Sequence, residues 1–109
     1  MKISLLVLRC GDIENSKGFY ESLGLSFIQE KHGNGPVHYS CENDGCVFEL
    51  YPNQVVKPMD NNRLGFTVND IDDVLSKVSV SSQYDFNGVT TYVVIDPDGR
   101  KVEINQKKL

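Results

Sequence analysis

Residues 44–50 read DGCVFEL and residues 98–104 read DGRKVEI, so one turn-and-strand pattern occurs twice in this chain, 54 positions apart. In each copy an Asp-Gly pair precedes a strand-like run that holds one glutamate, Glu49 or Glu103, between two apolar residues. Asp-Gly accepts the positive φ angles of a tight turn, so each copy predicts a turn followed by a strand. A match of this kind at corresponding places indicates an internal duplication.

A second repeat lies near the start of each half. Asp12-Ile13 recurs as Asp70-Ile71, each time after a strand-like run and at the start of a helical pattern. Aspartate is a strong helix N-cap, so both halves predict a helix at this place and together one βαβββ-like unit each. We expect strands over residues 3–8, 25–30, 37–41, 46–51, 63–68, 89–95 and 100–106. Residues 79–88 are ambiguous and indicate at most one short strand around Tyr84.

Length and pattern together predict a single domain of the α+β class. A chain of 109 residues is long enough for one core but not for two independent ones. We expect unit one at residues 1–52, a linker at 53–62 with one proline and three asparagines, and unit two at 63–109. The two βαβββ-type units should form a curved mixed sheet, a cup, with the helices outside.

The composition argues against two classes of partner. The formal net charge is -4, with 11 basic residues scattered among 15 acidic ones, so no basic face for nucleic acid is expected. No apolar run approaches the ~20 residues that span a bilayer, and the short run at the start does not resemble a signal peptide. We therefore expect no nucleic-acid partner, no membrane association and a cytoplasmic location.

The three cysteines, Cys10, Cys41 and Cys46, have no metal-type CxxC spacing. Cys41 and Cys46 could face each other across a hairpin and form a disulfide. Reduced, half-buried thiols that act as small hydrophobes are the favoured alternative in a cytosolic chain.

The two repeated glutamates are the first candidate functional residues. Side chains alternate across a strand, so the apolar neighbours of Glu49 and Glu103 should pack beneath the helices while the glutamates lie on the opposite, concave face. A single mid-strand glutamate is usually part of a solvated sheet face. Two at symmetric places would converge near the pseudo-twofold axis. Such a pair suits a hard divalent metal, a basic ligand group or an ion pair with a neighbouring cation.

Four segments carry a family likeness: GDIENSKGFYESLGL at 11–25, FELY at 48–51, GFTVNDI at 65–71 and DPDGRKVEI at 96–104. On these segments, which cover nearly the whole chain in order, the sequence resembles the vicinal oxygen chelate superfamily. That superfamily includes glyoxalases, bleomycin-resistance proteins, fosfomycin-resistance enzymes and extradiol dioxygenases. The resemblance implies the cup-shaped fold and a homodimer whose pocket draws on both chains.

The resemblance also implies where a metal would lie. Metal-dependent members place one ligand on the first strand of each unit and one on the last, which by position correspond here to Leu5, Glu49, Arg63 and Glu103. Leu5 has no donor atom, and Arg63 has no lone pair to donate. We therefore expect no metal or other cofactor at this place. Arg63 could instead supply the positive charge and bridge both glutamates, unless it is simply an exposed arginine at a strand start.

The remaining candidates are basic or aromatic residues of the predicted strands: His38, Tyr39, Tyr51 and Tyr92. The tyrosines could stack on a planar ligand, although simple core packing is an equal alternative. His38 could join Glu49 and Glu103 in a rearranged divalent-metal site, but a lone strand histidine is more often a hydrogen-bonded structural residue. His32 lies in the loop before it.

Two function classes follow from these candidates. The first is a metal-free binding protein of the glyoxalase/bleomycin-resistance type, in which Glu49, Glu103, Arg63 and the tyrosines orient a small cationic or aromatic ligand. The second is a metal-dependent lyase or dioxygenase with an atypical ligand set. A stable scaffold whose cup has no ligand is a third, blander option. We favour the first class.

Overall fold

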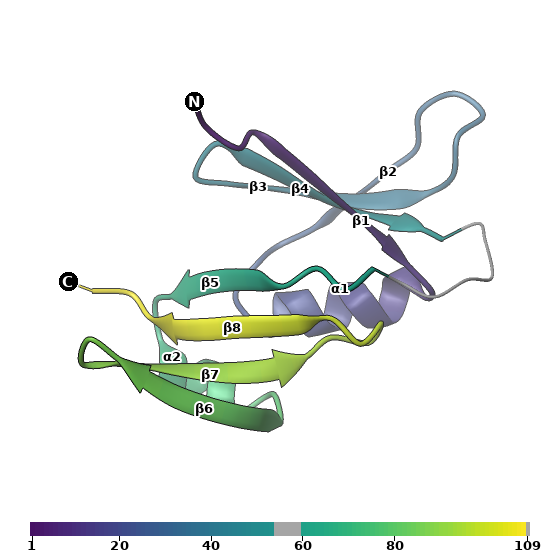
Figure 1. Cartoon of the computed structure of the whole chain (residues 1–109). Helices are drawn as coiled ribbons and strands as arrows, with labels where there is room; N and C mark the ends of the chain where they lie inside the picture. The colour runs from purple at the N-terminus through teal and green to yellow at the C-terminus, as the bar shows by residue number, and fades with distance from the viewer. Residues whose placement is uncertain (54–59, 109) are drawn as a thin grey trace.

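The computed structural model describes residues 1–53 and 60–108, in which the pattern of a strand, a helix and three strands occurs twice (Figure 1). This confirms the predicted α+β class with two βαβββ-type units. The first set of elements is β1 (Leu5–Cys10), α1 (Ile13–Glu21), β2 (Ile28–Glu30), β3 (His38–Asn43) and β4 (Cys46–Pro52). The second set is β5 (Leu64–Val68), α2 (Ile71–Leu75), β6 (Val80–Phe86), β7 (Val89–Ile95) and β8 (Lys101–Gln106).

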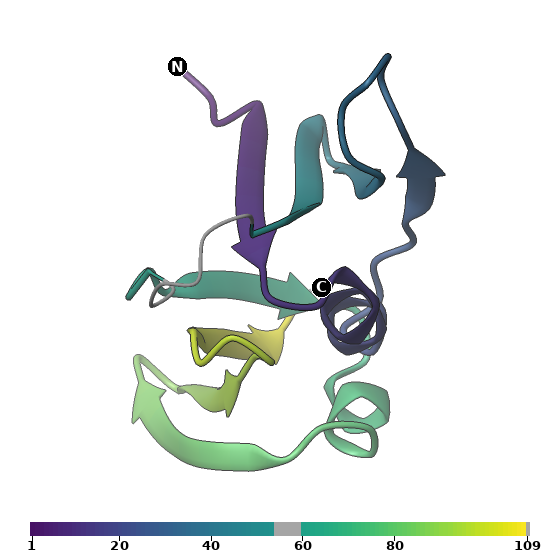
Figure 2. The ribbon, with the colours of Figure 1, turned by 90° about the vertical axis from the view of Figure 1, so that its right-hand side faces the viewer.

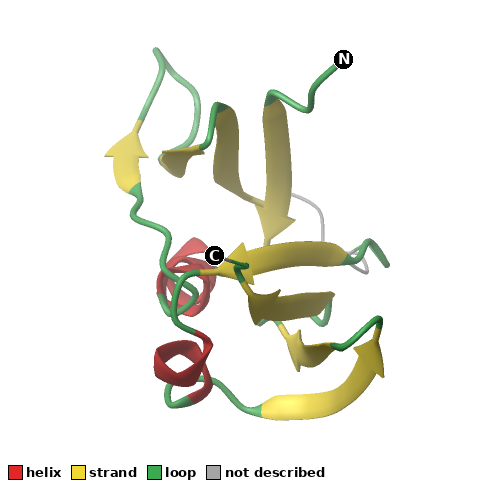
Figure 3. Cartoon of the chain, turned by 90° about the vertical axis from the view of Figure 1, so that its left-hand side faces the viewer, coloured by secondary structure: helices red, strands yellow, loops and turns green. Residues whose placement is uncertain are grey.

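Each set of strands builds a four-stranded mixed sheet, in the orders β1-β4-β3-β2 and β5-β8-β7-β6. In both sheets the first strand runs parallel to the last, and the other neighbours are antiparallel. Among the described residues no ladder joins the two sheets, whose strands run in different directions (Figure 3). The sheet predicted as one curved surface therefore consists of two open sheets.

Both helices lie side by side on one side of the molecule (Figure 2). Asp12 caps α1, because its Oδ1 accepts from the backbone N–H of Glu14 at 2.9 Å and of Asn15 at 3.2 Å. Asp70 caps α2 through Asp73 N at 3.1 Å, so both predicted N-caps are confirmed. The apolar sheet faces under the helices form the core. We call the opposite side of each sheet its open face.

A buried polar network links the two units. The Arg100 side chain, only 1% exposed, donates to Asp60, to Asp96 and to the carbonyl of Arg9. Asp96 also accepts a 2.7 Å hydrogen bond from the hydroxyl of Tyr20 on α1. Burial and the Asp96 carboxylate both raise the pKa of Tyr20, so the hydroxyl keeps its proton and remains a donor. The turn before β8 thus holds the first helix against the second unit.

Several strand predictions are wrong in their detail, and β2 covers only Ile28–Glu30 of the predicted 25–30. β1 begins two residues later than predicted, and its start is open: Ile3 is 74% exposed and Leu5 is 55% exposed, so it is not covered on both faces in a single chain. β6 is a full seven-residue strand where only a short one around Tyr84 was expected. All of its residues are exposed. Val80, Tyr84 and Phe86 alternate with polar residues, but Ser82 interrupts this alternation and weakens the strand signal.

The predicted linker, residues 53–62, is described only in part, since residues 54–59 lie outside the described residues. All three cysteines are free thiols. The β3–β4 register explains why Cys41 does not meet Cys46: Cys41 lies opposite Phe48, and Cys46 lies opposite Asn43. No helix in the described part of the chain is long and apolar enough to cross a membrane.

Candidate functional site on the open faces of the sheets

Glu103 is held by two neighbours on the open face of the second sheet. Its Oε2 accepts from Nη1 of Arg63 at 2.7 Å, and its Oε1 accepts from the hydroxyl of Tyr84 at 2.5 Å. The Glu103 side chain is 19% exposed and the Arg63 side chain 54%. The Tyr84 hydroxyl, together with the Arg63 guanidinium, lowers the pKa of Glu103 below its ordinary value. The charge of this carboxylate is therefore already matched within the chain.

Glu49 occupies the same place in the first sheet but has different surroundings. It is half-buried on β4, opposite Val7 on one side and Ser40 on the other. Within the described residues, no hydrogen bond or ion pair reaches its carboxylate. The duplicated motif thus gives one neutralised carboxylate, Glu103, and one that is available to accept from a ligand.

Aromatic and basic side chains lie beside Glu49 on the open face. Tyr51 follows it by two positions on β4, and the ring of His38 stacks on the Tyr51 ring at 4.1 Å between centroids and 11° between planes. The guanidinium carbon of Arg9 lies 5.0 Å from the Tyr51 ring centroid. Because alternate residues of a strand share a face, Glu49 and Tyr51 point the same way. The Tyr51 ring is thus held in place beside a free carboxylate.

The predicted bridge by Arg63 is found for one glutamate only. Arg63 contacts Glu103, whereas no contact to Glu49 is found among the described residues. A cavity of about 510 Å³ lies between the two units, against β1 and β5, and of the predicted site residues that the structure describes only Arg63 lines it. The hollow that the two glutamates were expected to share is therefore not closed around both of them in one chain.

Tyr39 and Tyr92 lie on the helix side of their sheets, which corrects the expectation that they line the cup. Tyr39 pairs with buried Leu50, and Tyr92 pairs with buried Ile104. The hydroxyl of Tyr39 donates to Glu14 on α1. The period-2 alternation puts both tyrosines on the face opposite the glutamates. Of the three predicted tyrosines, only Tyr51 is on the open face.

Tyr84 is a site residue that the sequence prediction missed, because Ser82 interrupts the apolar alternation of β6 and only a short strand was expected there. The Asn87-Gly88 pair could have found this strand: both residues have positive φ, at 51° and 76°. Asn-Gly is a strong hairpin signal, and it places β6 beside β7. The register Tyr84↔Thr91 then puts the Tyr84 hydroxyl on the side of Glu103.

His38 does not join the two glutamates. Among the described residues, one group of three potential metal ligands is found, and it consists of Glu30, His32 and His38. Nε2 of His38 lies 3.3 Å from Oε1 of Glu30. The rearranged set of Glu49, Glu103 and His38 is therefore not assembled in a single chain. The sequence signal for this group is the spacing of Glu30 and His32, which are separated by one residue.

Residues 2–104 match the family model of the Glyoxalase/Bleomycin resistance protein/Dioxygenase superfamily. The chain belongs to this superfamily. Among solved structures it is similar to Oxidase ChaP-H2, with a TM-score of 0.78 at 15% identity, covering 99% of this chain and 94% of that one. It is also similar to lactoylglutathione lyase from Agrobacterium tumefaciens, with a TM-score of 0.69 at 16% identity, covering 96% and 92%.

A glyoxalase family protein from Enterococcus faecalis is similar as well, with a TM-score of 0.68 at 20% identity, covering 96% of this chain and 97% of that one. No curated protein matches the sequence. At these identities the solved structures show that the superfamily's fold is shared. The activity of this chain has to be argued from its own side chains.

The superfamily's metal position can be tested on the donor atoms present. Its four places correspond to Leu5, Glu49, Arg63 and Glu103. Leu5 offers no donor atom, and Arg63 offers only N–H donors, one of which already bonds Glu103. Two carboxylates with a leucine and an arginine do not fit a divalent metal.

Proposed function

We propose that this protein binds a small organic ligand on the open faces of its sheets, without a metal ion at the superfamily's usual position. The observation that carries the proposal is that the two equivalent glutamates differ in their hydrogen-bond partners. Arg63 and Tyr84 satisfy Glu103, whereas Glu49 is half-buried without a partner among the described residues. A partly desolvated carboxylate is costly unless a cation or hydrogen-bond donor meets it.

The ligand class follows from the side chains around Glu49. A carboxylate binds an amine, amidine or other N–H donor most strongly through a charge-assisted hydrogen bond. Tyr51 adds an aromatic edge and a hydroxyl at the same face, and Arg63 adds a cation at the cavity between the units. We therefore propose a small ligand that carries a cationic or hydrogen-bond-donating group on an aromatic or apolar body.

A direct test is a screen of small aromatic amines and amidines against the whole protein by ligand-observed NMR. We expect hits to lose at least about tenfold in affinity in Glu49→Gln, because one charge-assisted hydrogen bond is worth about 1.5–3 kcal/mol. The control is Asp72→Asn, which removes one exposed charge from the helix side of the molecule. Hits that bind Glu49→Gln as tightly as the unchanged protein would reject the proposed site.

The proposal includes a homodimer, which the superfamily resemblance implies, and the cytoplasmic location expected from the sequence. It is supported by the apolar start of the chain, where Ile3 and Leu5 are exposed beside the free edge of β1. Sedimentation should give twice the chain mass of 12.2 kDa, and Ile3→Glu should shift the protein toward the monomer. A monomer at all accessible concentrations would contradict this part of the proposal.

The second candidate function is a metal-dependent lyase or dioxygenase that uses Glu49, Glu103 and His38. It would require these side chains to come together in an assembly of two chains. Elemental analysis of protein purified without chelators separates it from the first: a stoichiometric divalent metal that disappears in Glu49→Gln would favour the enzyme.

A further inference from the structure

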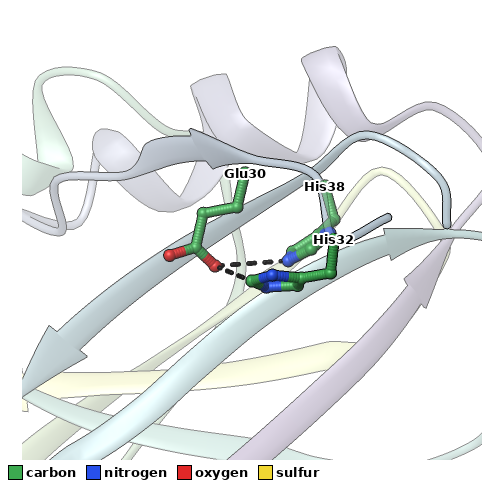
Figure 4. Close-up of side chains that lie close together, drawn as sticks. All are labelled: Glu30, His32 and His38. Carbon is green, nitrogen blue, oxygen red and sulfur yellow. Dashed lines mark hydrogen bonds and ion pairs between the residues drawn. The ribbon is translucent and has the colours of Figure 1, made fainter. Parts of the chain in front are cut away.

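A compact group of potential metal ligands lies at the end of the first sheet, away from the superfamily's metal position. Glu30 ends β2, His38 begins β3, and these two residues are paired across the antiparallel ladder. His32 lies in the short connection between the two strands (Figure 4). The three side chains point toward one another from one hairpin, so the same local turn positions all of them.

The spacing of the donor atoms fits a first-row transition metal. Oε1 of Glu30 lies 3.3 Å from Nε2 of His38 and 3.6 Å from Nε2 of His32, and one donor atom from each of the three residues lies within 4.8 Å of the others. Tetrahedral zinc has ligand bonds of about 2.0–2.2 Å, which places neighbouring ligand atoms about 3.3–3.6 Å apart. We propose that Glu30, His32 and His38 bind one Zn²⁺-like divalent ion through a carboxylate oxygen and two imidazole nitrogens.

The hydrogen bond on the far side of His38 supports a cation at this place. Nδ1 of His38 lies 3.2 Å from the carbonyl oxygen of Pro36, and a carbonyl can only accept, so this nitrogen carries a hydrogen. In the neutral ring Nε2 then presents a lone pair toward the Glu30 carboxylate. Two acceptors that face each other at 3.3 Å repel unless a cation lies between them. A metal ion or a second ring proton can fill this role.

The surroundings of the three ligands resemble those of a built metal site. Metal-binding histidines commonly donate their other N–H to a backbone carbonyl, as His38 does to Pro36, and this fixes the ring orientation. Stacking on Tyr51 holds the same ring, whose side chain is only 1% exposed. His32 is 72% exposed, so the group of ligands opens to solvent on the side of this residue. Two histidines with one glutamate and an open position form a ligand set that zinc uses in catalytic sites.

The test is a calorimetric titration in which Zn²⁺ alone is added to the chelator-treated full chain. We expect one ion per chain, and we expect His32→Ala and Glu30→Gln each to weaken Zn²⁺ binding by at least about tenfold. His32 is mainly exposed, so its variant should fold even if a variant of buried His38 does not. The matched control is Glu42→Gln, a carboxylate at the other end of the same β3 strand.

The outcome distinguishes this metal site from the proposed ligand site at Glu49. It also distinguishes a bound metal ion from a second proton on the His38 ring. Zn²⁺ binding that survives Glu49→Gln and fails in His32→Ala supports the hairpin site, whatever the ligand screen gives. Absence of stoichiometric binding, or equal affinity in His32→Ala, would overturn the proposal. So would ¹⁵N NMR showing that both nitrogens of His38 keep their protons at neutral pH after one equivalent of Zn²⁺ is added.

Discussion

At the scale of single residues, the duplicated motif places two glutamates in different surroundings. Glu103 is paired within the chain, and Glu49 has no partner among the described residues. Glu49 and Glu103 stand at equivalent places on β4 and β8, which the sequence repeat predicted. The predicted bridge from Arg63 to both glutamates is found for Glu103 only. The contact of Tyr84 with Glu103 was not predicted, because only the Asn87-Gly88 turn, which was not used, fixes the register of β6 against β7.

Removing the Tyr84 hydroxyl should raise the pKa of Glu103. This hydroxyl is the largest of the effects that lower the pKa of the carboxylate, so Tyr84→Phe should move it up toward its ordinary value. The check is an NMR titration of the glutamate side-chain carboxyl carbons in the two proteins. Tyr51→Phe is the control and should leave Glu103 unchanged. A Glu103 titration that is the same in Tyr84→Phe would mean that the hydrogen bond is not formed in solution.

At the scale of elements, local signals predicted most helix starts and hairpins but not the faces of every strand. The Asp12 and Asp70 caps and the Asp44-Gly45 turn were readable because each depends on a few adjacent residues; both residues of the turn have positive φ. The sequence left Tyr39 and Tyr92 open between the ligand face and core packing, and the structure places both on the helix side. Tyr39 lies opposite buried Leu50 and Tyr92 lies opposite buried Ile104, so both point to the helix side. Only the register between neighbouring strands fixes these pairings.

The Asp12 cap should contribute measurably to stability. Asp12→Ala removes the acceptor for two backbone N–H groups at the start of α1, so we expect a loss of about 1 kcal/mol in the free energy of unfolding. Asp12→Asn keeps an acceptor and should retain most of that stability. Urea unfolding followed by circular dichroism measures both. Equal stability of the alanine variant and the original chain would show that the cap is not used.

At the scale of the whole molecule, a few buried polar contacts connect the units. The Asp98-Gly99 pair predicted only a turn. In the structure Asp96 accepts from the hydroxyl of Tyr20 on α1, and Asp98 accepts from the backbone N–H of Gly11, just before α1. Contacts between residues more than 70 positions apart leave no periodic signal. We therefore infer that both units unfold together, as the predicted single domain requires.

The Asp60–Arg100 pair should make stability depend on pH on the acid side. Hydrogen bonds from Arg100 lower the pKa of Asp60 below its ordinary value of 3.8. A lowered folded-state pKa means that this stabilisation is complete above about pH 4 and is lost as the pH falls through the lower folded value. Thermal unfolding of the original chain and Asp60→Asn should therefore differ most above pH 4 and converge below it. A difference that is constant across pH 2–6 would contradict this linkage.

Metal-free ligand binding is tested most directly by the dissociation constant of a confirmed small-molecule hit, measured by calorimetry before and after exhaustive treatment with EDTA. Because Arg63 supplies the positive charge beside Glu103, we expect the same constant within about twofold in both samples. Binding that disappears on EDTA treatment, returns with a divalent metal, and behaves alike in His32→Ala would contradict a metal-free site at Glu49 and Glu103.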